Sequence, residues 1–343
     1  MKEPVTIALD AMGGDNAPQI VVAGANIARR RHPNINFIFF GDEPEIEKHL
    51  SKFRRLKEVV EIHHTTETVK PEDKPSFVLR NGRNTSMWWA VNSVKVGQSS
   101  GVVSAGNTGA LMALTMYQWR NLTGIDRPAI ASFFPTLRGE TVMLDLGANI
   151  SCDADNLVQF AVMGEVYSRT ILGIDDPTVG LLNVGEEETK GNDSLKEAAE
   201  IIKEIDFPGE FVGFVEGNDI PAGVVDVVVT DGFTGNIALK TAEGTATLIN
   251  GFVREAFRNS FMAKIGYLFA KHSLDKLRNR SDPRRYNGAM FLGLNGICVK
   301  SHGGTDALGF ATAIGVAVDM IEYGGNQMIA DHIARLGLSE TRM

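Results

Sequence analysis

Short runs rich in valine, isoleucine and phenylalanine alternate along the chain with longer segments in which apolar residues recur at helical spacing. This alternation is typical of a parallel sheet whose strands are joined by crossover helices. The sequence therefore predicts an α/β fold, a layered α/β/α arrangement with a Rossmann-like sheet. The expected strands span residues 5–9, 36–40, 101–104, 130–134, 141–146, 179–183, 211–215 and 224–229. The expected helices include residues 18–31, 85–96, 108–119, 157–172, 193–205, 236–257 and 307–323.

The length of the chain limits how it can be divided. With 343 residues, the chain lies near the practical limit of a single hydrophobic core. No glycine- and serine-rich linker, low-complexity tract or long-period repeat marks a boundary. We therefore expect residues 1–343 to form one catalytic unit, either undivided or built of two lobes.

Charge and cysteine content exclude several classes of protein. The 34 Lys and Arg against 42 Asp and Glu give a net charge of -8, which argues against a protein that coats nucleic acid. Cys152 and Cys298 are too few for a disulfide framework, so we expect both thiols to be free in a reducing cytosol. The first residues lack the apolar core of a secretory signal, and no apolar run reaches the roughly 18 residues of a membrane span. We expect a cytoplasmic protein, for which peripheral contact with a membrane surface stays open.

Four expected strands are followed by loops of small and polar residues: 10–15, 104–109, 145–149 and 231–236. Each loop taken singly is explained more readily as a turn and a helix cap than as a binding site. Ligands of open α/β sheets bind beyond the carboxyl ends of strands, however, and we expect the four loops to line one crevice. The loop 104–109 precedes a helix, whose positive end suits an anion such as phosphate.

Two further polar segments are candidates. Lys190 follows an expected strand, with three glutamates before it and glycines on both sides; the alternative is a solvated charged loop. His302 precedes another helix and could exchange protons near neutral pH, although a lone histidine is more often structural.

Several common catalytic motifs are missing. The sequence contains no G-x-G-x-x-G, no Walker motif and no H-E-x-x-H, so it gives no direct case for a nicotinamide, nucleoside triphosphate or zinc site. The segment 97–101 matches G-x-S-x-G, but it follows a helix and precedes a strand, the reverse of the context that exposes a nucleophilic serine. Cys298 lies in an apolar run and is interpreted as a core residue.

Seven short motifs, taken in order, resemble the PlsX family of bacterial phosphate acyltransferases over nearly the whole chain. They occupy residues 10–15 (DAMGGD), 104–109 (SAGNTG), 127–129 (RPA), 145–149 (DLGAN), 216–219 (EGND), 231–236 (DGFTGN) and 300–303 (KSHG). Asn287 stands where the family pattern suggests glycine, and Phe291 is bulkier than the usual aliphatic residue.

The resemblance implies transfer of a long-chain acyl group from acyl carrier protein to inorganic phosphate, which gives an acyl phosphate for phospholipid (phosphatidic acid) synthesis. It also implies a homodimer with a fold similar to the isopropylmalate dehydrogenase and phosphate acetyltransferase group, and a downstream glycerol-3-phosphate acyltransferase as a partner. No cofactor, metal or nucleic acid is expected. The family pattern places catalysis on Lys190 and Asn236. The phosphate- or substrate-binding candidates are Gly13, Gly14, Asp15, Ser104, Gly106, Asn107, Thr108, Gly109, Asp145, Asn149, Glu187, Asp231, Thr234 and His302.

This reaction agrees with the residues themselves. Phosphate is already a nucleophile, so its attack on a thioester needs positioning and stabilisation of the oxyanion but no serine or cysteine relay. We expect backbone N–H groups around residues 106–109 to hold phosphate and Lys190 to offset its charge. Asn236 is expected to donate a hydrogen bond to the thioester oxygen.

Residues 252–286 form a basic segment in which apolar side chains recur near helical spacing. The segment predicts one or two amphipathic helices interrupted near Gly266, and it suits an anionic membrane, the acidic acyl carrier protein or a packed dimer. The candidate contact residues are Phe257, Phe261, Ile265, Leu268, Phe269, Arg278 and Arg280. Two alternatives for the whole chain stay open: a nicotinamide-dependent dehydrogenase of related fold, and a non-catalytic protein that binds acyl ligands or membranes.

Overall fold

The computed structural model describes residues 4–258, 261–280 and 282–337. Eleven strands of this part form one sheet in the order β3-β2-β1-β4-β11-β10-β5-β6-β9-β7-β8. The strands are β1 (Val5–Asp10), β2 (Ile35–Gly41), β3 (Val60–His64), β4 (Gly101–Ser104), β5 (Ala129–Pro135), β6 (Glu140–Leu144), β7 (Thr178–Leu182), β8 (Glu210–Val215), β9 (Val227–Val229), β10 (Ala289–Leu292) and β11 (Ile297–Lys300).

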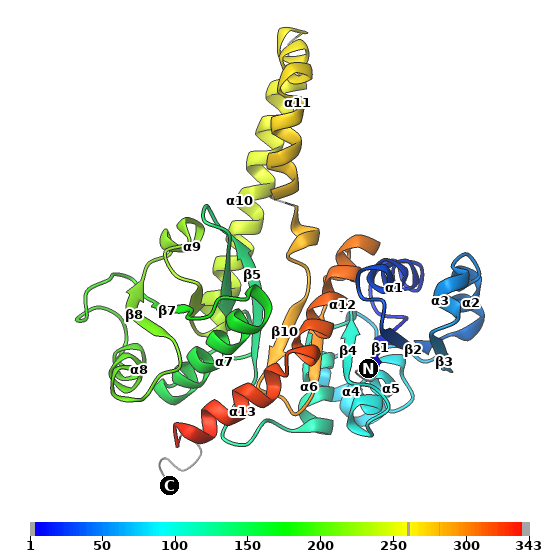
Figure 1. Ribbon diagram of the computed structural model, residues 1–343, viewed down its shortest axis with the longest axis horizontal. Helices are drawn as coiled ribbons and strands as arrows, with labels where there is room; N and C mark the ends of the chain where they lie inside the picture. The colour runs from blue at the N-terminus through cyan, green and yellow to red at the C-terminus, as the bar shows by residue number, and fades with distance from the viewer. Residues whose placement is uncertain (1–3, 259–260, 281, 338–343) are drawn as a thin grey trace.

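Helices connect most of these strands and cover both faces of the sheet (Figure 1). They are α1 (Gln19–Arg31), α2 (Glu43–Leu50), α3 (Arg54–Lys57), α4 (Pro75–Asn81), α5 (Ser86–Lys95), α6 (Thr108–Trp119), α7 (Ala154–Leu172), α8 (Asp193–Glu204), α9 (Asp219–Ala222), α10 (Gly232–Arg258), α11 (Phe261–Arg280), the 3-10 helix η1 (Pro283–Arg285), α12 (Ala307–Glu322) and α13 (Gly325–Arg335). The predicted α/β fold is confirmed.

The sheet consists of two parallel blocks that run in opposite directions. β3, β2, β1, β4 and β11 are parallel to one another, and so are β6, β9, β7 and β8. Between the blocks, β10 is antiparallel to β11 and β5, and β5 is antiparallel to β6. The expectation of a parallel sheet is therefore wrong at its centre. The connections 136–139 and 293–296 are too short for a crossover, so each chain reversal produces an antiparallel pair.

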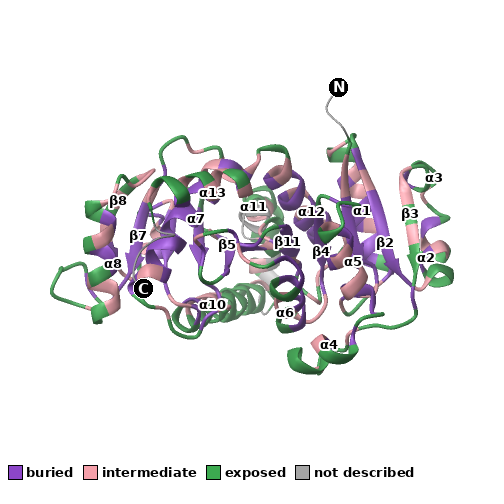
Figure 2. Ribbon diagram, turned by 90° about the horizontal axis from the view of Figure 1, so that it is seen from below, coloured by how far each residue is buried: buried purple, intermediate pink, exposed green. Residues whose placement is uncertain are grey.

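Strand side chains alternate between two apolar cores. In β1, Ile7 and Leu9 belong to the core formed with α1, α7, α12 and α13, whereas Ala8 belongs to the core beneath α4, α5 and α6. Phe37 and Ile38 of β2 divide in the same way. Apart from the edge strands β3 and β8, the strands are buried along most of their length, as Figure 2 shows in purple. Burial on both faces explains why the sequences of the inner strands are mostly apolar rather than alternating.

The helices α10 and α11 form a hairpin that projects away from the sheet (Figure 1). Phe257 and Tyr267 pack edge to face across it, with ring centroids 5.6 Å apart. Most of α10 beyond its first turns is exposed and is green in Figure 2. The predicted interruption near Gly266 is wrong, because α11 continues through this residue.

Each expected strand and helix has a counterpart, and boundary shifts are mostly small. The sequence reasoning missed β3, β10, β11, the short helices α2, α3, α4 and α9, and the longer helix α13. In the described part of the chain, no single helix is long and apolar enough to cross a membrane; the consecutive pair α12 and α13, bent by 52°, meets that requirement only when joined.

Candidate active site

The carboxyl ends of β1, β4 and β11 bring together a first group of predicted residues around the buried carboxylate of Asp10. Ser86 Oγ donates to Asp10 Oδ1 and Ser104 Oγ donates to Asp10 Oδ2, both at 2.7 Å. Ser104 Oγ in turn accepts from the N–H of Gly106 at 3.0 Å. Burial raises the pKa of Asp10, and the two serine hydrogen bonds act in the opposite direction. One carboxylate thus fixes β1, α5 and the turn after β4.

Glycine lets the loop after β1 approach the turn after β4. A Cβ at Gly13 would lie 2.5 Å from Asp10 Oδ2 and 2.8 Å from the nitrogen of Gly106. Gly14 has a φ of 102°, and a Cβ there would lie 2.9 Å from the Cβ of Ala105. Both positions exclude a larger side chain, so the family motif at 10–15 has a packing reason.

The loop after β11 joins the same group. The N–H of Asp15 donates to the carbonyl of Gly303 at 3.0 Å. His302 is exposed; its Nδ1 accepts from the N–H of Gly304 at 3.1 Å, and its own N–H donates to Asn287 Oδ1 at 2.9 Å. The loop that carries Asp15 therefore contacts the loop that carries His302, at the same edge of the sheet as Ser104.

Asn107 plays a structural role at the start of α6. Its Oδ1 accepts from the N–H of Ala110 at 3.0 Å, and its Nδ2 donates to the carbonyls of Pro71 at 2.9 Å and Asp73 at 3.0 Å. The side chain thus caps α6 and holds the segment before α4. Thr108 and Gly109 are exposed in the first helical turn, where N–H groups face outward.

Asp145 is the centre of a second group, at the carboxyl end of β6. This fully buried carboxylate accepts hydrogen bonds from the N–H groups of Ile130, Gly147, Ala148 and Asn149 at 2.7 to 3.1 Å, and from the Asn149 side chain at 2.9 Å. Burial raises the pKa of Asp145, and these donors oppose the rise. Asp145 and Asn149 therefore shape the loop 145–149.

The same loop lies against the first turns of α10. A Cβ at Gly147 would lie 3.8 Å from Asn236 Oδ1, so the exposed side chain of Asn236 stands over Gly147. Asp231 caps the helix: it accepts from the Thr234 N–H at 2.9 Å and from the Thr234 hydroxyl at 2.7 Å. Asp231 and Thr234 are thus engaged with each other, whereas, among the described residues, the exposed side chain of Asn236 has no partner of this kind in the loop and lies over Gly147.

The contact between α10 and this loop leads to a first prediction. A Cβ at the buried Gly235 would lie 2.0 Å from the backbone oxygen of Asp145. Gly235→Ala is therefore expected to lower the free energy of unfolding by about 1–3 kcal/mol through overpacking, and to lower activity by displacing Asn236. Gly244→Ala, on the same helix with no atom near its Cβ, should instead gain about 0.5–1 kcal/mol. Urea unfolding checks both, and equal stability of Gly235→Ala and the parent would contradict the packing account.

Lys190 lies in the loop after β7. Its Nζ is 3.4 Å from Glu187 Oε1, with the two side chains 51% and 63% exposed. The backbone N–H of Glu187 and the charge of Lys190 lower the pKa of this carboxyl. Asn183 Nδ2 donates to the carbonyl of Lys190 at 3.2 Å, and Glu188 pairs with Lys203 at 2.5 Å. The loop is anchored at its backbone, and the ammonium of Lys190 faces solvent.

The predicted residues thus fall into two sets. Lys190, Asp145 and Asn236 follow strands of the β6-β9-β7 block, and Ser104 and His302 follow strands of the oppositely directed block. Within the described ranges, no hydrogen bond or ion pair given above joins the two sets. The premise that all four loops leave one edge of a parallel sheet is wrong, because β5 and β6 are antiparallel.

Three residues that organise the first group were not among the predicted site residues: Asp10 and Lys300, which begin the motifs 10–15 and 300–303, and Ser86. Asp10 and Lys300 each carry a charge at the end of an apolar strand, and this signal could have identified them. Ser86 gave no signal, since its contact with Asp10 spans 76 positions.

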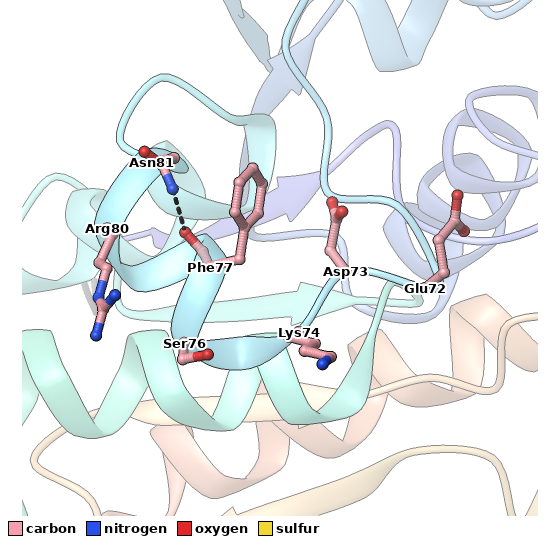
Figure 3. Close-up of a pocket in the computed structure, with 7 residues that line it drawn as sticks. All are labelled: Glu72, Asp73, Lys74, Ser76, Phe77, Arg80 and Asn81. Atoms are coloured by element: carbon pink, nitrogen blue, oxygen red, sulfur yellow. Dashed lines mark hydrogen bonds between the residues drawn. The ribbon is translucent and has the colours of Figure 1, made fainter.

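The structure also has a pocket of about 370 Å³ beside α4 (Figure 3). Glu72, Asp73 and Lys74 line it from the segment before the helix, and Ser76, Phe77, Arg80 and Asn81 from the helix itself. None of the predicted catalytic or phosphate-binding residues lines this pocket. One link to the candidate site is Asp73, whose carbonyl accepts a hydrogen bond from Asn107 Nδ2.

Cysteine and metal chemistry find little support in the described residues. Cys152 and Cys298 are free, as expected. Burial raises the pKa of Cys152 to about 12 and also raises that of Cys298, so neither thiol is activated as a nucleophile. In residues 4–258, 261–280 and 282–337, no group of three or more His, Cys, Asp or Glu side chains could hold a metal ion.

Comparison with solved structures identifies the class of fold. The chain resembles a phosphotransacetylase from Streptococcus pyogenes (TM-score 0.63, 18% identity, 94% of this chain and 95% of the other). It also resembles the EutD phosphotransacetylase from Staphylococcus aureus, with a TM-score of 0.56 and 17% identity over 91% of this chain and 94% of the other. A 4-hydroxythreonine-4-phosphate dehydrogenase from Klebsiella pneumoniae has a TM-score of 0.53 and 12% identity over 94% of this chain and 98% of its own. This α/β fold is thus shared by acyl-transferring enzymes and dehydrogenases.

The particular family follows from closer relatives. The family model described as "Fatty acid synthesis protein" matches residues 5–328. The phosphate acyltransferase of Rhodospirillum centenum is 62% identical over 98% of this chain and 95% of its own length. The phosphate acyltransferase of Paramagnetospirillum magneticum is 58% identical over 99% of this chain and 97% of its own length. The chain belongs to the phosphate acyltransferase family, as the motifs predicted, and it is an acyltransferase. The dehydrogenase likeness concerns the fold alone.

Proposed function

We propose that the chain transfers a long-chain acyl group from acyl carrier protein to inorganic phosphate. A phosphate oxygen attacks the thioester carbonyl, the new C–O bond forms and the C–S bond breaks. The proton of the phosphate ends on the thiolate that leaves. The products are an acyl phosphate and the free thiol of acyl carrier protein, so the reaction needs no added oxidant or cofactor.

The observation that carries this proposal is the fixed turn between β4 and α6. Asp10 and Ser104 hold its first residues, and Asn107 caps the helix that follows. Such a turn presents the N–H groups of Thr108 and Gly109 to an anion without cost of reorganisation. The N–H of Gly106, which was expected to bind phosphate, donates instead to Ser104 Oγ.

Asn236 and Lys190 complete the proposed chemistry. Asn236 donates to the developing oxyanion of the thioester, and Lys190 offsets the charge of phosphate. We propose that both sets of loops contact one substrate although they follow oppositely directed blocks of strands, and we infer that the whole chain acts as one catalytic unit. A crystal soaked in phosphate tests this arrangement: an ion bound far from both the 104–109 turn and Lys190 would overturn it.

Thiol release from acyl-acyl carrier protein tests the function directly. The purified chain should release thiol only when phosphate is present, and the rate should saturate with phosphate. Sulfate, an anion of similar shape that forms no stable acyl adduct, is the control for ionic effects. Phosphate-independent release, or none with any of several acyl lengths, would contradict the proposed function.

An acyl phosphate is a reactive mixed anhydride, so it can donate its acyl group to a second enzyme. We propose that a downstream glycerol-3-phosphate acyltransferase consumes it on the way to phosphatidic acid. A membrane-bound consumer favours release close to the lipid surface, at the cytoplasmic face. We also propose a homodimer.

The helical hairpin α10–α11 is the proposed membrane contact. Leu268 and Phe269 are 70% and 88% exposed, and Arg258, Lys271 and Lys276 add exposed positive charge. Ile265 and Phe257 are half-buried. The side chains of Phe261, Arg278 and Arg280 lie outside the described residues. Exposed apolar side chains beside basic ones are suited to the interface of an anionic bilayer.

The double variant Leu268→Asp/Phe269→Asp is expected to lose most binding to anionic vesicles, because it removes apolar burial and adds like charge. Vesicle sedimentation measures the loss. Val96→Asp/Tyr323→Asp, which alters two exposed apolar residues elsewhere, should bind like the parent. Unchanged vesicle binding of the hairpin variant would exclude the membrane role. Loss of dimer in analytical ultracentrifugation, or loss of turnover with acyl carrier protein, would then identify the hairpin's partner.

A further inference from the structure

Lys300 ends β11 between two turns of the candidate site. β11 pairs in parallel with β4, where Lys300 is opposite Ser104. The Nζ of Lys300 donates to the carbonyl of Ala105 at 3.3 Å and also to the carbonyl of Ser301. The ammonium therefore links the turn that precedes α6 to the turn that carries His302.

One peptide unit is held at both ends by these contacts. Its carbonyl, that of Ala105, accepts from Lys300, and its N–H, that of Gly106, donates to Ser104 Oγ at 3.0 Å. Ser104 is in turn fixed by the buried carboxylate of Asp10. A planar peptide held at both its oxygen and its nitrogen cannot rotate, so the direction in which the chain enters α6 is set here.

We propose that Lys300 is a positioning residue for the phosphate seat: by holding the Ala105 carbonyl, it orients the first turn of α6 toward the bound anion. The inference rests on the proposed function, which places phosphate at this turn. The positive charge of Lys300 also lies near the phosphate seat, and the negative charges of Asp10 and Asp15 balance it. Losing this ammonium would both loosen the turn and leave the negative charges of Asp10 and Asp15 without this compensating charge.

The titration of Lys300 allows its role to be tested by the pH dependence of phosphate binding. Burial lowers its pKa from 10.5 to about 8, while Cys298, Asp10 and Asp15 act to raise it. His302, on the next turn, is the other titratable group close in sequence. Above pH 8 the folded chain releases the proton that an unfolded chain keeps up to about 10.5, so this group makes the free energy of unfolding rise with pH in that window. A loss of phosphate affinity from pH 7 to 9 through Lys300 is therefore not caused by unfolding of the chain.

The test compares Lys300→Met with Lys95→Met, a surface control on α5. Lys300→Met should raise the KM for phosphate, and its calorimetric Kd for phosphate, about tenfold, the usual effect of one charged hydrogen bond. The KM for the acyl donor should stay within twofold of the parent, a split that general loosening of the fold would not produce. A parental KM for phosphate in Lys300→Met would overturn the inference.

Lys300→Arg and the parent chain provide the second measurement. The parent should lose phosphate affinity between pH 7 and 9, and Lys300→Arg, which stays charged, should keep its affinity over this range. Equal loss of phosphate affinity in both chains contradicts the role of Lys300 even if Lys300→Met does not fold. A parent that binds phosphate but releases no thiol contradicts the proposed function alone, because calorimetry needs no acyl donor.

Discussion

Asn236→Ala is expected to lower kcat about 10²- to 10³-fold, the usual cost of removing one donor to a developing oxyanion. The side chain is exposed and stands over Gly147, so its truncation opens no buried cavity. The thermal melting temperature should therefore stay close to that of the parent. Thiol release at saturating phosphate and acyl donor measures the change.

Asn250→Ala is the matched control, because Asn250 is also an exposed asparagine on α10. We expect it to retain at least half of the parental kcat. If Asn236→Ala also stayed within a factor of two of the parent, Asn236 would be removed from the proposed role and the donor to the thioester oxygen would have to be sought elsewhere.

Lys190→Ala is expected to lower kcat/KM for phosphate about 10²-fold, since it removes the positive charge proposed to offset the attacking anion. Glu187, its present partner, would then stand unopposed and repel phosphate. Both side chains are largely exposed, so unfolding should be little changed. Steady-state kinetics with varied phosphate, alongside a thermal melt, separates the two effects.

The neighbouring pair Lys203 and Glu188 offers the control for this experiment. Lys203→Ala removes an equal charge from the same region and should leave kcat/KM within about twofold, as exposed ion pairs contribute little. A Lys190→Ala chain with the parental value would show that this ammonium serves only its surface ion pair.

The local pattern of the sequence was enough to predict most elements. β1 and β2 are mostly apolar, and α6 starts as expected because Asn107 caps it. β10 and β11 were missed, although β4 is equally short; β10 lies between Gly288 and Gly293, and β11 follows Gly296. Their strand character comes from pairing with β5 and β4, far away in the sequence. The antiparallel pairing of β5 with β6 follows from the short connection 136–139 and was open to local inference, whereas the pairing of β10 with β5 joins distant segments and was not.

The candidate site shows the same limit. Glycine and polar residues after strands indicated where binding loops lie, and the structure places Ser104 and Asn236 in such loops. The clamp of Asn107 on Asp73 and the hold of Lys300 on Ala105 join positions 34 and 195 residues apart, so no local pattern reports them. Asn287, a departure from the family pattern, proves to anchor Ser301 Oγ at 2.8 Å and the N–H of His302.

The place of β11 has a consequence for biosynthesis. Residues 297–300 lie between β4 and β10, so the N-terminal strands have an open edge at β4 until these residues have left the ribosome. Unpaired edges of this kind invite pairing with other chains, and closing contacts so distant in sequence is slow. Nascent chains stalled before position 297 should consequently depend on chaperones, and C-terminal truncations should aggregate rather than yield a smaller folded protein.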